Sequence, residues 1–76
     1  MGQERLSVAN PEEGEALTYY RCYMIAQDGA FGAVREAFSA NDAEALEFGR
    51  EQLKTELIYR RAEVWQQGRL VGSLAR

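Results

Sequence analysis

The sequence predicts a small α+β domain in which one helix packs across a four-stranded, antiparallel-rich sheet, with the order β-β-α-β-β. Three observations predict this two-layer sandwich: an Asp-Gly turn between two apolar runs, one amphipathic run with capping signals, and a second pair of short apolar runs. A single helix and four short strands bury their apolar faces best as two layers. We therefore expect one domain over residues 18–76.

The first two strands are expected at residues 18–27 and 30–39, joined by Asp28-Gly29. Asp-Gly between such runs is a strong signal for a two-residue hairpin loop, and this loop fixes the register of the strands. In that register Arg21 faces Glu36, which places opposite charges directly across the hairpin. The same register pairs Tyr23 with Val34, Tyr19 with Phe38 and Ala26 with Phe31.

A helix is expected at residues 42–57 because capping signals precede it and apolar residues recur at helical spacing. Asn41 can cap the first amides, and Glu44 can reach back to the preceding backbone. Residues 59–61 then close the helix and place two arginines near its negative end. Phe48 lies away from the apolar stripe. That stripe is expected to comprise Ala43, Leu46, Gly49, Leu53 and Leu57.

The last two strands are expected at residues 61–66 and 69–74, around a Gln67-Gly68 turn. A two-residue loop places Trp65 and Leu70 on one face of the sheet, whereas a bulged loop that includes Gly68 shifts the pairing. Trp65 therefore has two possible positions, on the open face of the sheet or in the core beneath the helix. With the two-residue loop, the opposite face carries Ala62, Val64 and Val71.

Both faces of the first hairpin are apolar, yet one helix covers only one of them. We assign the helix to the face of Cys22 and Met24, whose small or adaptable side chains suit a leucine-lined helix. That face also carries Tyr20, Ala26, Phe31, Ala33 and Ala37, with Arg35 as its only charge. The other face then forms an aromatic patch that is larger than monomers usually expose.

This aromatic patch predicts a surface for a partner, most simply a second copy of the chain in a dimer. The predicted function is therefore a non-enzymatic domain for oligomerisation or protein interaction, and its biological process stays unknown. Lesser alternatives are the stacking of a flat aromatic ligand on Trp65 and the stacking of single-stranded bases. The candidate interface residues are Tyr19, Tyr23, Ile25, Val34, Phe38, Trp65, Leu70 and Phe48.

Charge is concentrated at one end of the chain. Residues 1–17 contain one arginine and four glutamates, a net charge of −3, which equals the formal charge of the whole chain. Proline and glycine interrupt this segment, so we expect a flexible acidic tail before a neutral folded body. A neutral body argues against nucleic acid as a partner. The apolar runs are too short to cross a membrane, and no signal peptide is recognisable, which predicts a cytoplasmic protein.

Most catalytic and metal-binding chemistry lacks its residues. The chain has no histidine and a single cysteine, so we expect no internal disulfide, no zinc site and no cofactor. No serine has a neighbour that would activate it as a nucleophile. Cys22, in the middle of a strand on the face assigned to the core, is expected to be a buried hydrophobe. We therefore predict no enzymatic activity.

Several short motifs carry a family resemblance. They are Tyr20-Arg21-Cys22-Tyr23 before Asp28-Gly29, Asn41-Asp42-Ala43-Glu44-Ala45, Glu63-Val64-Trp65-Gln66 and Gly68-Arg69-Leu70-Val71. Through them, residues 18–74 resemble a group of short, uncharacterised proteobacterial proteins, a domain of unknown function with this hairpin-helix-hairpin order. The resemblance implies the fold and carries no activity.

A fainter similarity rests on the tyrosine-rich first strand, on Phe38-Ser39-Ala40-Asn41-Asp42 and on Ala43-Glu44-Ala45-Leu46. In these segments the chain resembles the HicB-type antitoxin domain. That resemblance implies oligomer formation and neutralisation of a small toxin, which is the alternative function. The chain departs from that family because it lacks the Pro-Gly-Cys turn before the serine and a following DNA-binding element.

Overall fold

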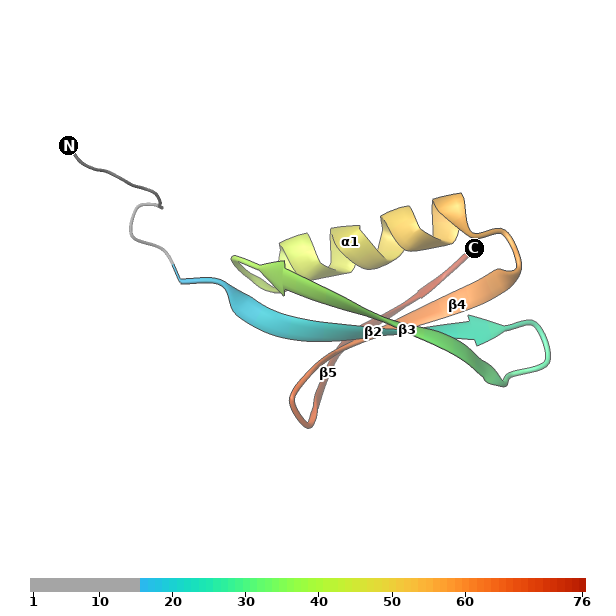
Figure 1. Cartoon of the computed structure of the whole chain (residues 1–76), viewed down its shortest axis with the longest axis horizontal. Helices are drawn as coiled ribbons and strands as arrows, with labels where there is room; N and C mark the ends of the chain where they lie inside the picture. Colours follow the sequence, from blue (N-terminus) through green and yellow to red (C-terminus); the bar gives the residue numbers. More distant parts are fainter. Residues whose placement is uncertain (1–15) are drawn as a thin grey trace.

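The predicted order β-β-α-β-β is confirmed in the computed structural model, which describes residues 16–76 (Figure 1). The predicted acidic tail, residues 1–17, lies almost wholly outside the described residues. Four antiparallel strands form one sheet in the order β3-β2-β4-β5, and the helix connects β3 to β4. The elements are β2 (Thr18–Ala26), β3 (Phe31–Ser39), α1 (Asp42–Thr55), β4 (Tyr59–Gln66) and β5 (Arg69–Ala75).

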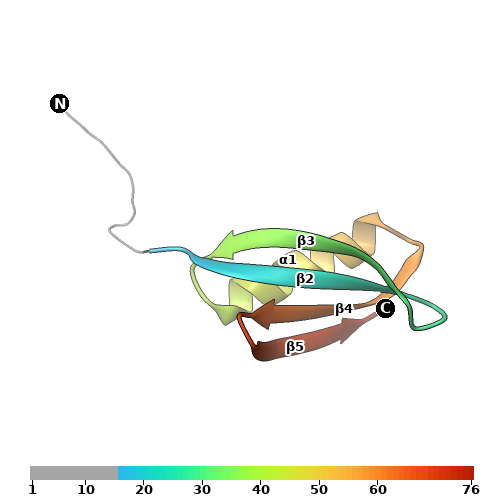
Figure 2. The ribbon, with the colours of Figure 1, turned by 60° about the horizontal axis from the view of Figure 1, so that its bottom comes forward.

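Helix α1 covers one face of the sheet, here called the inner face. In Figure 2 the sheet lies in front of α1, and no described element covers the face turned toward the viewer. We call this uncovered side the outer face. The two-layer sandwich predicted from the sequence is therefore confirmed, and its single helix leaves half of the sheet surface open.

The first hairpin keeps most of the predicted register. Tyr19, Arg21 and Tyr23 pair with Phe38, Glu36 and Val34, as predicted. The loop has three residues rather than two, because the Ala26 amide donates to the Ala30 carbonyl at 2.9 Å and Gly29 adopts a φ of 90°. A left-handed residue after a tight turn is typical of three-residue hairpin loops, and glycine adopts it at little cost.

A bulge beside this loop overturns one predicted pair. The register shifts between Met24 and Ile25, so Phe31 lies opposite Ile25 rather than Ala26. Phe31 was predicted on the inner face, but its ring contacts Tyr23 on the outer face, with 5.4 Å between the ring centroids. The extra residue of a bulge reverses which face the following side chain occupies, so the prediction for Phe31 was wrong.

The core lies between α1 and the inner face. Cys22 and Met24 are buried there, which confirms the face assigned to the helix. A Cβ atom at Gly49 would lie 2.8 Å from Leu74 Cδ1 and 3.1 Å from Val64 Cγ2, so this glycine allows the close approach of helix and sheet. The buried cluster comprises Tyr20, Cys22, Met24, Ala37, Ala45, Leu53, Tyr59, Ala62 and Val64.

Asn41 begins the helix as predicted. Its side-chain oxygen accepts a hydrogen bond from the Glu44 amide at 2.9 Å, and Glu44 Oε1 accepts one from the Ala40 amide at 3.0 Å. The reciprocal bond of the capping box therefore reaches one residue further back than usual. Asp42 and Glu44 place two acids in the first turn, where the helix dipole favours them.

The predicted end of the helix was wrong. Helix α1 ends at Thr55, and Leu57, expected on its buried stripe, is 73 % exposed in the following turn. Ala43, also expected on the stripe, is exposed, whereas Ala45 is fully buried. Phe48, expected away from the core, is half-buried and packs against the buried cluster. The buried face of the helix is therefore rotated from the predicted stripe toward Ala45 and Phe48.

Arg76, rather than the arginines at positions 60 and 61, satisfies the end of the helix. Its guanidinium donates hydrogen bonds to the carbonyl oxygens of Leu53, Glu56 and Tyr59. Residues 59–61 belong instead to β4, where Tyr59 is buried. The last carbonyls of a helix lack intrahelical partners, so a cation that donates to them both caps the helix and complements its dipole.

Candidate functional site

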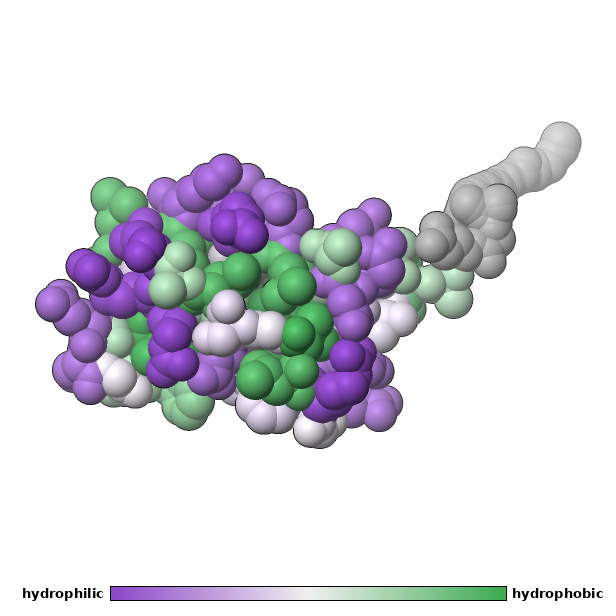
Figure 3. All heavy atoms as spheres, turned by 180° about the vertical axis from the view of Figure 1, so that it is seen from behind, coloured by the Kyte–Doolittle hydropathy of each residue, from purple (hydrophilic) through white to green (hydrophobic). Residues whose placement is uncertain are grey.

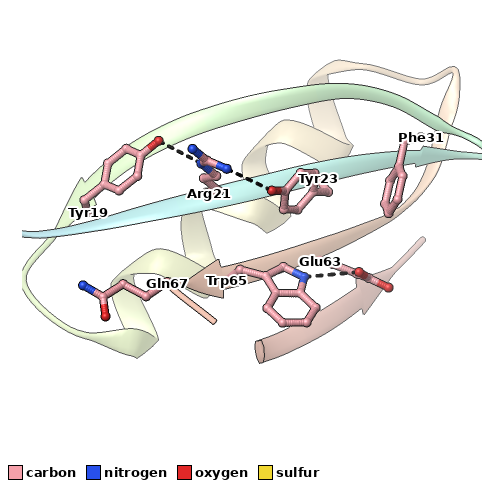
Figure 4. Close-up of a pocket in the computed structure, with 7 residues that line it drawn as sticks. All are labelled: Tyr19, Arg21, Tyr23, Phe31, Glu63, Trp65 and Gln67. Atoms are coloured by element: carbon pink, nitrogen blue, oxygen red, sulfur yellow. Dashed lines mark hydrogen bonds between the residues drawn. The ribbon is translucent and has the colours of Figure 1, made fainter. Parts of the chain in front are cut away.

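The outer face contains a shallow hollow of about 640 Å³. Four of its lining side chains are aromatic, one is a cation, one is an acid and one is an amide. Figure 4 shows that they come from β2, β3, β4 and the turn that follows β4. The lining residues are Tyr19, Arg21, Tyr23, Phe31, Glu63, Trp65 and Gln67.

Strand alternation and one turn place these side chains together. Residues two apart in a strand share a face, so Tyr19, Arg21 and Tyr23 project from the outer side of β2. The two-residue turn Gln67-Gly68 pairs Trp65 with Leu70, which confirms the two-residue alternative beside the loop. A register shift between Val64 and Trp65 then places Val64 opposite Gly72 rather than Val71, so the two-residue register does not continue along the hairpin. Trp65 therefore lies on the outer face, directly opposite Arg21, and not in the core beneath the helix.

Arg21 lies in the middle of the aromatic row on β2. Its Nε donates to the Tyr19 hydroxyl at 3.1 Å, and its Nη1 donates to the Tyr23 hydroxyl at 3.3 Å. The guanidinium carbon lies 6.0 Å from the centroid of the Tyr19 ring, within the range of a cation–π contact. These hydrogen bonds raise the pKa of Arg21 above its usual range, so the side chain stays charged at all relevant pH values.

Arg21 and Glu36 do not form the expected ion pair, because a tyrosine hydroxyl lies between them and is hydrogen-bonded to both. The two residues lie opposite each other as predicted, but the Tyr19 hydroxyl stands between them and donates to Glu36 Oε2 at 3.0 Å. Within residues 16–76, no carboxylate lies within ion-pair distance of Arg21. The cation of the hollow is therefore held by neutral hydroxyl groups.

Glu63, the acid of the hollow, is in contrast neutralised. Its Oε2 lies 3.0 Å from Arg61 Nη1, and its Oε1 accepts a hydrogen bond from Trp65 Nε1 at 3.2 Å. Both carboxylate oxygens are thereby engaged, and the indole is held in place beside them (Figure 4). The hollow therefore combines a compensated acid with an arginine that has no acidic partner among the described residues.

The predicted interface residues divide into exposed and covered groups. Val34 and Phe38 are 49 % and 64 % exposed on β3, and the Phe38 ring packs 5.3 Å from Tyr19. Ile25, by contrast, is only 2 % exposed, so its side chain cannot contact a partner. Phe48 packs on the core and is no separate surface patch.

Leu70, another predicted interface residue, lies on the edge strand β5 and is exposed. Figure 3 views the molecule from the side of β5 and shows apolar atoms in the middle of this side, with hydrophilic residues around them. Leu70 itself lies outside the hollow, since it is not among the lining residues.

Sequence reasoning missed several residues of the hollow. Phe31 was assigned to the other face because Gly32, the in-strand glycine that the bulge leaves unpaired, was not taken as the signal of a bulge. Arg21 was taken as half of a strand-crossing ion pair, although its two tyrosine neighbours at i±2 are the side chains it contacts. Glu63 and Gln67 were not considered, and their position follows only from the pairing of β4 with β2.

Cys22 is the free thiol of the described residues, and it is buried in the core. Burial raises the pKa of the Cys22 thiol to about 11, so the thiol is protonated and weakly nucleophilic at neutral pH. Residues 16–76 contain no group of three or more acids or cysteines placed to hold a metal ion. Within the same residues, α1 is too short and too polar to cross a membrane.

Searches with protein-family models, among curated proteins and among solved structures gave no match for this chain. The two resemblances noted in the sequence therefore stay predictions.

Proposed function

We propose that this chain is a non-enzymatic interaction domain whose outer sheet face binds a second copy of itself. The observation that supports this proposal is the exposure of large apolar side chains on one uncovered face. Phe31, Val34 and Phe38 are 68 %, 49 % and 64 % exposed beside the half-buried rings of the hollow. Contiguous apolar surface of this kind is typical of interaction sites, and Tyr, Trp and Arg are enriched in them.

The charges on the outer face favour a second copy over a partner of one strong charge. Arg21 and Arg61 lie on this face together with Glu36 and Glu63. Two such faces can pack with unlike charges opposed, as in sheet-on-sheet sandwiches whose inner faces interdigitate. A domain of about 60 residues also buries only about 60 % of its unfolded surface, so association would add stability that its own core cannot supply.

The proposal includes a cytoplasmic setting and no catalytic role. Cys22 is a free, buried thiol, a state that suits a reducing compartment. Burial raises the pKa of this thiol, which lies on the inner side of β2 while the hollow lies on the outer side. Neither observation supplies a nucleophile or a proton donor at the outer face.

Sedimentation equilibrium over a concentration series tests the proposal. We expect the wild-type chain to form a dimer, and we expect Phe38→Ser to weaken the dimer at least tenfold, because it removes an exposed ring from the face. Ile58→Ser is the matched control: Ile58 is 74 % exposed but lies in the turn between α1 and β4. It should leave the association constant unchanged.

Two results would overturn this function. A wild-type chain that stays monomeric at millimolar concentration would exclude self-association. Equal effects of Phe38→Ser and Ile58→Ser would show that the outer face is not the interface.

A further inference from the structure

We propose that the hollow around Arg21 binds a flat aromatic compound that carries a carboxylate or a phosphate. This inference goes beyond self-association, because it assigns a small-molecule site within the outer face. It depends on two features that lie side by side: a wall of aromatic rings and a cation without an acidic partner among residues 16–76.

The aromatic wall is held in place by its own contacts. Trp65 is half-buried, and its indole N–H is bonded to Glu63. Tyr23 packs against Phe31 at one end of the hollow, with an angle of 50° between the ring planes. Rings fixed in this way offer a flat apolar surface without the loss of side-chain freedom that a mobile site would suffer on binding.

Arg21 supplies the polar part of the site. Its Nε and Nη1 donate to the two tyrosine hydroxyls, which fixes the plane of the guanidinium, while Nη2 has no acceptor among the described residues. A guanidinium presented with a free donor binds a carboxylate or a phosphate through short, charge-assisted hydrogen bonds. The structure therefore points to an oxyanion on the ligand.

The register places the two features at the right separation for one small molecule. Arg21 and Trp65 are direct partners across β2 and β4, and opposed residues have Cβ atoms about 5 Å apart. A ring stacked on the indole can thus direct an attached oxyanion at the guanidinium. The volume of about 640 Å³ lies within the usual range for small-molecule sites and suits one or two fused rings.

The charge of the hollow selects against other ligands. Glu63 is engaged by Arg61, and Glu36 is connected to Arg21 only through the Tyr19 hydroxyl, so Arg21 is the charged group of the hollow that no described carboxylate contacts directly, and a cationic ligand is disfavoured. A single-stranded nucleic acid needs a basic groove that follows several phosphates, whereas the hollow supplies one unpaired cation. A small aromatic anion fits this charge better than a polyanion does.

Isothermal titration calorimetry with three naphthalene probes tests the proposal: 2-naphthoate, 2-naphthyl phosphate and the neutral 2-naphthamide. We expect both anions to bind at least tenfold more tightly than the amide, since a charge-assisted hydrogen bond is stronger than a neutral one. The tighter of the two anions shows which oxyanion the site prefers. The chain has a single tryptophan, so the shift of its one indole N–H resonance locates the probe.

Arg21→Met should remove the preference for the anions and leave the circular dichroism spectrum unchanged. Arg50→Met is the matched control, because Arg50 is an exposed helix residue paired with Glu47 and remote from the hollow. It should bind all three probes as the wild type does. All titrations are repeated in Phe38→Ser, which substitutes no lining residue but removes the ring that packs on Tyr19, so that failure of self-association and failure of ligand binding are separate results.

Three outcomes would overturn the proposal. The first is equal affinity for the anions and the amide, and the second is an unchanged preference in Arg21→Met. The third is tighter binding of a twelve-nucleotide single-stranded DNA than of 2-naphthyl phosphate, which would assign the face to nucleic acid.

Discussion

The two faces of β2 show how one strand can serve two purposes. On its inner side, Cys22 and Met24 are buried beneath α1. On its outer side, Tyr19, Arg21 and Tyr23 line an open hollow. Small and flexible side chains occur where a helix packs closely, and large rings occur where no element of the chain covers them. The comparison indicates that stability depends mainly on the inner face, whereas the outer face is free to bind.

Among the variants that test this comparison, Met24→Ala is expected to lower the free energy of unfolding the most. Met24 has no exposed surface, so truncation leaves a cavity beneath α1 and should lower the free energy of unfolding by about 2–5 kcal/mol. Val34→Ala, on the outer side of β3, should cost less than about 1 kcal/mol. Urea denaturation of both variants measures the difference. Similar losses in the two variants would contradict the division of roles between the faces.

The Cys22 thiol reports on how tightly the inner face is closed. Because the thiol is buried and its pKa is raised to about 11, a thiol reagent at pH 8 should modify native Cys22 at least about 100-fold more slowly than the unfolded chain. Absorbance of the released chromophore, with and without urea, gives the two rates. Rapid modification of the native chain would mean that α1 opens readily from the sheet.

Asn41→Ala tests the start of the helix that closes the inner face. Loss of the hydrogen bond from the Glu44 amide should lower the free energy of unfolding by about 1 kcal/mol. Asn41→Ser keeps a capping oxygen and should recover most of that loss. Thermal unfolding followed by circular dichroism measures both, and an equal loss in the two variants would exclude a capping role.

The smallest expected effect concerns pH. Hydrogen bonds from Arg69 and then from Tyr20 lower the pKa of Asp42, so the folded state favours the ionised carboxylate. Because the pKa of Asp42 is lowered on folding, its ionised carboxylate stabilises the fold at pH values above its pKa in the unfolded chain, near 4. This stability is lost as the pH falls through its pKa in the folded state.

Asp42→Asn should therefore be less stable than the wild type at pH 7, with a smaller difference at pH 2–3. Urea midpoints at the two pH values test this. A difference that does not depend on pH would show that the charge of Asp42 contributes nothing.

Local sequence signals predicted the elements well and their ends less well. The Asp-Gly and Gln67-Gly68 turns and the Asn41 cap act through neighbouring residues, so their positions are readable without the fold, although the length of the first loop was predicted one residue too short and that of the second was left open. The end of the helix was predicted two residues too late. Arg76, far away in the sequence, donates to the carbonyl oxygens of Leu53 in the last turn and of the C-cap residue Glu56, and no local pattern contains that information.

The candidate site was predicted only in part for the same reason. Alternation along β2 placed Tyr19 and Tyr23 on the outer face, but it could not foresee the bulge that brings Phe31 to join them. Trp65 had two possible positions until the pairing of β4 with β2 was known. The role of Arg21 changed as well, because a tyrosine hydroxyl separates it from the glutamate that faces it.

The sequence by itself determined the α+β class, the order of the elements and the face of β2 that α1 covers, because periodicity, caps and turns are properties of short segments. The tertiary structure decided where the helix ends and which face holds Phe31 and Trp65. It also decided that Arg21 lies in an aromatic hollow, where no acid of the described residues forms an ion pair with it. These features depend on strand register and on contacts between residues far apart in the chain, which no local pattern specifies.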